Sequence, residues 1–177
     1  MKQISMSLTA LQSALHLLNC SGTCLLPQPG YTADESTEAF LRGRDELCEN
    51  GWAALDFDGK VSSSREFARL TYDIVYAEAA MRLELPDKTQ WYLRAPTEML
   101  FIEQKQEAMF LERRSGRSLM PWIRETALTA VTGTLTTLHM KKTRQLLLEQ
   151  FKEDSQERAQ ELVKHLALFF GKEGDNA

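Results

Sequence analysis

Hydrophobic positions in the first quarter of the chain recur at helical intervals. One stripe over residues 7–19 is formed by leucines spaced three and four apart: Leu8, Leu11, Leu15 and Leu18. A loop rich in proline follows. Thr32 and Glu35 then form a capping-box pattern, in which the hydroxyl accepts a backbone N–H and the glutamate reaches back. The pattern predicts a second helix over 33–49 that ends at Gly51.

The third helix is predicted after a short extended segment. Residues 52–57 read as extended, and Asp58-Gly59 is a turn dipeptide. Ser63 and Glu66 repeat the capping-box spacing, and the apolar stripe that follows runs to about residue 77. These elements together predict a helical N-terminal unit over about 1–78, with the order of a winged helix.

The period changes to two in the middle of the chain. Residues 81–85 and 91–95 alternate apolar with polar, which predicts two strands that each have one solvent-exposed face. Residues 99–102 and 108–111 are apolar at successive positions, so both faces of those strands should be covered. The run 113–117 reads as a polar hairpin or loop.

The C-terminal third is predicted to be mainly helical. Ser118 before Pro121 marks a helix start, and a helical pattern that includes Leu146-Leu147 runs from about residue 139 to Phe170, where Gly171 ends it. Threonines and Gly133 in 132–137 weaken a helix there, and that segment stays unassigned. The expected fold is a single α+β domain over 1–177. It has the N-terminal helical unit, an antiparallel sheet of about four strands and C-terminal helices within about 79–171, and a disordered tail, 172–177.

Charge and cysteine content narrow the function classes. The net charge of the 177 residues is −4, and residues 31–58 hold eight acids against two bases. This balance argues against a general nucleic-acid binder. No apolar run approaches the ~20 residues of a membrane-spanning helix. Three cysteines at irregular spacing indicate reduced thiols rather than a disulfide framework, so we expect a cytoplasmic protein.

Candidate reactive groups do not combine into a recognisable catalytic site. His16, Cys20 and Cys24, perhaps with Cys48, could share a metal, but the first helix should end before Cys20, and packing is the favoured interpretation. Asp56-Phe57-Asp58-Gly59 begins like a calcium loop, yet Lys60 occupies the third ligand position and Phe67 the twelfth. We therefore expect no metal, no cofactor and no enzymatic activity.

One segment resembles a known family. The run Phe40-Leu41-Arg42-Gly43, followed by Leu47 to Val61 with the pattern D-x-D-G-x-V, is similar to the ESX secretion-associated proteins, the cytosolic chaperones of type VII secretion. The order of strands and helices is similar across most of the chain, although this chain is shorter. The resemblance implies a chaperone that binds a helical, WXG-type pair of secretion substrates and inserts into no membrane.

The candidate protein-binding surface is an aromatic and arginine cluster on the sheet. Such residues are enriched in interface hot spots. The candidates are Arg82, Trp91, Tyr92, Arg94, Arg113, Arg114 and Arg117. Trp91 could instead be a core residue, with Tyr92 on a strand surface.

Two other functions stay open. A winged-helix regulator would read DNA through the third helix, but Arg65 and Arg69 there are opposed by Glu66 and Asp73. A small enzyme would have to assemble its groups from distant parts of the chain.

Overall fold

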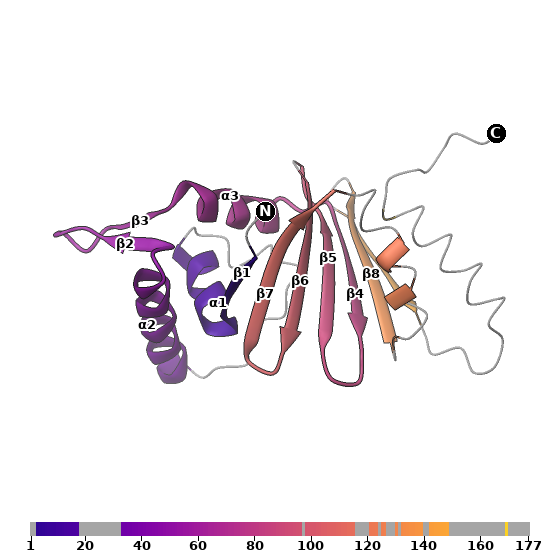
Figure 1. Ribbon diagram of the computed structural model, residues 1–177, viewed down its shortest axis with the longest axis horizontal. Coiled ribbons are helices and arrows are strands. Elements are labelled where there is room, and N and C mark those ends of the chain that lie inside the picture. Colours follow the sequence, from indigo (N-terminus) through magenta and orange to yellow (C-terminus); the bar gives the residue numbers. More distant parts are fainter. Residues whose placement is uncertain are drawn as a thin grey trace.

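The computed structural model has an α+β fold built on one large antiparallel sheet (Figure 1). It describes residues 3–17, 33–96, 98–115, 121–123, 125–126, 130, 132–139, 142–148 and 169. The sheet order is β1-β7-β6-β5-β4-β8-β9, and each neighbouring pair is antiparallel. This confirms the predicted fold class.

The N-terminal unit follows the predicted order of helices. Helix α1 spans Leu8–Leu17, α2 spans Ala33–Glu49 and α3 spans Arg65–Val75. A two-stranded hairpin of β2 (Ala53–Leu55) and β3 (Val61–Ser63) stands between α2 and α3. The cap of α3 is Ser64, one residue after the predicted Ser63, and its side chain accepts from the backbone N–H of Phe67.

All four predicted strands form the middle of the sheet. They are β4 (Ala79–Glu84), β5 (Thr89–Arg94), β6 (Met99–Lys105) and β7 (Ala108–Arg114). Arg113 and Arg114 therefore belong to a strand, and their assignment to a loop was wrong. Pairing with β6 extends β7 to these residues, because Arg113 lies opposite Leu100 and Arg114 opposite Met99.

Three further strands enlarge the sheet beyond the expected four. Strand β1 (Ile4–Ser7) pairs with β7, and β8 (Thr132–His139) pairs with β4. Strand β9 (Lys142–Leu148) pairs with β8, so the helical interpretation of Leu146-Leu147 was wrong. Successive apolar residues fit a strand as well as a helix, and pairing with a neighbouring strand decided between them. The rest of the predicted last helix, up to residue 168, and the tail lie outside the described residues.

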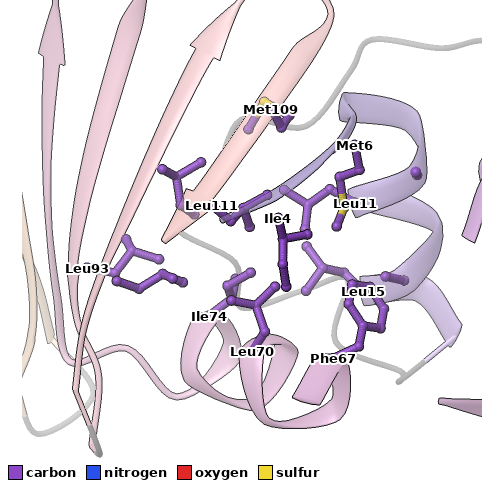
Figure 2. Close-up of a cluster of buried hydrophobic side chains, with 14 of the residues drawn as sticks. Ile4, Met6, Leu11, Leu15, Phe67, Leu70, Ile74, Leu93, Met109 and Leu111 are labelled. Atoms are coloured by element: carbon purple, nitrogen blue, oxygen red, sulfur yellow. The ribbon is translucent and has the colours of Figure 1, made fainter. Parts of the chain in front are cut away.

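The sheet is covered on both faces. On one face, α1 and α3 pack against β1, β5, β6 and β7 around Ile4, Leu11, Leu70 and Leu93 (Figure 2). On the other face, residues 121–126, which are helical where described, and Phe169 cover Met81 and Phe101. The central strands therefore lie between two hydrophobic layers.

This double cover corrects the expected exposed face of β5. Gln90, Trp91, Tyr92 and Leu93 are all buried, although the sequence alternates polar with apolar there. On β4 only Arg82 is exposed. For β6 the expectation of two covered faces is confirmed over 99–102, whereas β7 alternates buried with partly buried positions.

Candidate functional site

The predicted binding residues divide between the two faces of the sheet. Trp91 lies in the core layer beneath the N-terminal helices, where Arg82 stands 5.9 Å from its ring and Arg113 reaches α3. The opposite face is covered by Trp122 and Phe169. Trp122 contacts Tyr92 and Arg114, and the backbone oxygen of Phe169 accepts from Arg94. Arg117 lies outside the described residues. Trp91 and Tyr92 are neighbours in β5, and successive residues of a strand point to opposite faces of the sheet.

Trp91 and Tyr92 are inaccessible to a partner. Their exposed fractions are 1% and 0%. Trp91 is a core residue, as the alternative interpretation held, but Tyr92 is not a surface residue. Arg94 donates to the backbone oxygen of Phe169 at 2.9 Å, and so fixes a residue far along the chain.

Arg113 forms a buried ion pair with Asp73 of α3. The Nη2 and Oδ2 atoms are 2.6 Å apart, and the two side chains are 5% and 1% exposed. This arginine holds α3 to the sheet and is not available to a partner.

Tyr92 begins a chain of polar contacts within the second layer. Its hydroxyl donates to Gln90 Oε1 at 2.7 Å, and Gln90 Nε2 donates to Glu103 Oε2 at 2.7 Å. Lys88 Nζ lies 2.9 Å from the same carboxylate. Burial raises the pKa of Tyr92 to about 12, with a smaller contribution from the charge of Glu103, while a hydrogen bond with Thr126 acts in the opposite direction.

Arg114 packs inside an aromatic cluster. Its guanidinium carbon lies 4.4 Å from the Trp122 ring centroid and 5.6 Å from that of Phe101, and Glu112 accepts from it at 2.7 Å. The Tyr92 ring contacts both aromatic rings. This cluster attaches the segment around Trp122 to the sheet, which is a structural role.

The exposed aromatic surface lies instead on the β2–β3 hairpin. Phe57 is fully exposed, at 105%, and Leu55 is 42% exposed. Figure 1 places this hairpin at the left end of the molecule, projecting beyond α2 and away from the sheet. From sequence, this segment was predicted to be a turn and carried the family resemblance, but it was not among the candidate binding residues. The overlooked signal was an aromatic residue between two aspartates within a turn.

The hairpin tip is held in one conformation by Asp56. Its carboxylate accepts from the N–H groups of Asp58 at 3.0 Å and Lys60 at 2.7 Å. Gly59 has a φ of +75°, a left-handed conformation that favours glycine. At the base, Trp52 stacks on Phe67 of α3. The exposed Phe57 ring therefore stands on a turn whose backbone is held by hydrogen bonds and whose base is packed against α3.

A second exposed surface is the outer face of α3. Tyr72 and Tyr76 are 47% and 56% exposed, and their ring centroids are 4.4 Å apart. Arg65 and Arg69 are also exposed, and all four positions recur at the spacing of one helix face. The buried residues Phe67, Leu70 and Ile74 occupy the opposite face.

Of the histidine and cysteine candidates that the structure describes, His16 is exposed and Cys48 is partly buried. His16 meets Phe40 edge-on at 5.1 Å, and Cys48 is partly buried against the first core layer. Cys20 and Cys24 lie outside the described residues. Within the described part of the chain, no group of three or more histidine, cysteine, aspartate or glutamate residues is placed to hold a metal ion.

No protein-family model matches this chain, and no curated protein matches it. None of the described helices has the length and apolar character needed to span a membrane.

Proposed function

We propose that this chain is a non-catalytic chaperone or adaptor that binds another protein through its β2–β3 hairpin. The observation that carries the proposal is the full exposure of Phe57 at the hairpin tip. Burial of a phenylalanine side chain is favourable by about 1.5–3 kcal/mol, and this ring gains none of it within its own chain. Contact with a partner would bury it.

The ordered turn supports the same proposal. A loop already held in its bound conformation loses little conformational entropy on binding. Asp56 restrains the turn with two hydrogen bonds, and the stacking of Trp52 on Phe67 fixes its base. The central strands are covered on both faces by the chain's own elements, and Phe57 is the most exposed large hydrophobic residue in the described part of the chain.

The proposed class of partner rests on the similarity of one segment to a chaperone family. The hairpin contains Asp56 to Val61, the segment that is similar to the ESX secretion-associated chaperones. We propose that the partner is a helical pair of type VII secretion substrates, bound in the cytoplasm without turnover. The apolar side chains at one end of such a pair would bury Phe57.

Affinity capture from the native host tests the proposal. The wild-type chain should retain a small helical secretion-substrate pair, identified by mass spectrometry, and Phe57→Asp should lose it. With the purified pair, calorimetry should show binding at least ~30-fold weaker for Phe57→Asp, as for an interface hot spot.

Leu41→Asp is the matched control. Leu41 is an apolar residue of α2 that is 41% exposed, so the same charge is introduced away from the hairpin. Both variants should unfold within about 0.5 kcal/mol of the wild type, because neither side chain is buried. Equal capture by the wild type and Phe57→Asp would refute the role of the hairpin. Capture of no helical pair by the wild type would refute the class of partner.

A further inference from the structure

The outer face of α3 combines two arginines with a pair of tyrosine rings in contact, tilted by 36°. Arg65, Arg69, Tyr72 and Tyr76 lie along one side of the helix. Tyrosine and arginine are enriched at interface hot spots. Two half-exposed rings in contact also offer an apolar surface on which a third aromatic ring can pack.

The charge of this face differs from the charge of the helix sequence. Asp73 is buried and paired with Arg113, so it does not offset the surface arginines. Among the described residues, neither Arg65 nor Arg69 makes an ion pair, and Glu66 is the single exposed acid of α3. The exposed face of α3 is therefore basic and aromatic.

The hairpin tip carries the complementary groups. It presents the Phe57 ring between the carboxylates of Asp56 and Asp58, followed by Lys60, and all four residues are exposed. The Phe57 ring can pack on the two tyrosine rings of α3, and the carboxylates beside it carry the charge opposite to that of the α3 arginines. Lys60 likewise carries the charge opposite to that of Glu66.

We infer that two copies of this chain associate through a two-fold contact in which the hairpin tip of each packs on the α3 face of the other. In Figure 1 the hairpin extends away from the helix that follows it, so its tip points away from its own α3. Two such segments placed side by side in opposite directions bring each tip onto the partner's helix. A two-fold axis makes both contacts at once.

A second copy fits this face better than a nucleic acid does. Phosphate binding needs a basic surface beyond one helix face. The neighbouring α2 and hairpin expose acids instead, including Asp45, Glu49 and Asp58. Those acids would repel a phosphate backbone, and Asp58 at the hairpin tip would attract the arginines of a second copy.

The contact should be weak and reversible. Aromatic side chains bury about 150–250 Å² each. Two tip-to-helix contacts then bury on the order of 1,000 Å² in total, at the small end of specific interfaces. We therefore expect a dimer with a micromolar dissociation constant that weakens as salt rises.

Sedimentation velocity of the purified chain, without any partner, tests the inference. The wild type should pass from monomer to dimer between about 1 and 200 µM. Phe57→Ala should remain monomeric, or bind at least ~10-fold more weakly. Salt of about 1 M, where the Debye length is ~3 Å, should also shift the equilibrium toward monomer.

Two charge-reversal variants, measured alone and as a mixture, test the contact most specifically. Asp58→Lys gives a basic tip facing a basic helix, and Arg69→Glu gives an acidic helix facing an acidic tip. Each variant alone should be monomeric. An equimolar mixture should dimerise, because both contacts of the mixed dimer then join opposite charges. Arg42→Glu, the same change on the exposed part of α2, should leave the wild-type equilibrium unaltered.

Several results would overturn the inference. They are a wild type that stays monomeric over the whole concentration range, reversal variants that dimerise like the wild type, or a mixture that stays monomeric. Binding of a labelled DNA duplex that Arg69→Glu abolishes would assign the face to nucleic acid instead. Circular dichroism must show that each variant is folded. Because no partner protein is present, failure here does not bear on the affinity capture. Both contacts would bury the same Phe57 ring, so the partner complex and the dimer exclude each other at a given hairpin.

Discussion

The ion pair of Asp73 and Arg113 joins α3 to the sheet at a site that water does not reach. Removing one member of a buried pair leaves the other charge without compensation, which costs about 3–5 kcal/mol. Asp73→Asn should therefore lower the free energy of unfolding by that amount in urea denaturation. The side chains involved are 1% and 5% exposed.

The exposed pair Arg44–Asp45 is the control for that measurement. Its side chains are 29% and 56% exposed, and such pairs contribute at most about 1 kcal/mol. Asp45→Asn should be close to neutral. Replacing both buried partners by apolar residues, Asp73→Leu with Arg113→Met, should recover much of the loss, since no buried charge then remains. Equal effects of Asp73→Asn and Asp45→Asn would contradict the structural role.

Tyr92 makes stability depend on alkaline pH. Its pKa is raised from 10.0 to about 12 in the folded chain. A raised pKa stabilises the fold below the unfolded value, and that contribution is lost as pH rises through the folded value. The free energy of unfolding should fall by at most about 3 kcal/mol between these two pKa values, from the ~1.4 kcal/mol that accompanies each unit.

The comparison with Tyr92→Phe isolates this effect. The variant lacks the ionisable hydroxyl, so the difference in unfolding free energy, wild type minus variant, should decrease steadily above pH 10. Chemical denaturation across that range measures it. A difference that stays constant with pH would show that Tyr92 titrates alike in the folded and unfolded chain.

Helices α1 and α2 touch most closely at Gly43. A methyl group added there would lie 2.3 Å from Ser13 Oγ and 2.5 Å from the backbone oxygen of Thr9. Backbone atoms cannot move aside at low cost, so Gly43→Ala should cost about 1–3 kcal/mol despite the better helix propensity of alanine. Glu38→Ala, at an exposed position of the same helix, should be neutral in the same thermal unfolding assay.

Elements with strong local signals were predictable from sequence, and elements that depend on distant partners were not. The bounds of α2 match the predicted 33–49, and the four central strands were found from their alternation and apolar runs. Strand β1 has four residues, which is too short for a periodic pattern. Strands β8 and β9 depend on pairing with β4 and with each other, and a local pattern does not contain that information.

At the scale of the whole molecule, the last described residue completes the core. Phe169 is 0% exposed in the second hydrophobic layer, and its backbone oxygen accepts from Arg94, 75 residues away. Phe169→Ala should lower the free energy of unfolding by about 3–5 kcal/mol, as for a large buried ring. The variant should also bind a hydrophobic dye more strongly, because the opposite face of the sheet becomes accessible.

Phe110→Ala provides a comparison for that measurement. Phe110 of β7 is only partly buried, so the same substitution there should lower the free energy of unfolding by less. If the two variants were equally stable, the segment around Phe169 would not be part of the cooperative fold.

The sequence by itself determined the α+β class, the three N-terminal helices, the hairpin turn and the central strands. Periodicity, caps and turn residues act between near neighbours, so each of these signals is complete within a short stretch of chain. Whether a side chain is exposed depends on which distant segments of the chain pack against it. The tertiary structure buried Tyr92 beneath the C-terminal segment and turned Arg113 inward to Asp73, and it left Phe57 in solvent because no other described element reaches the hairpin tip. Residue type selected the candidates for binding, but only packing decided which of them a partner can touch.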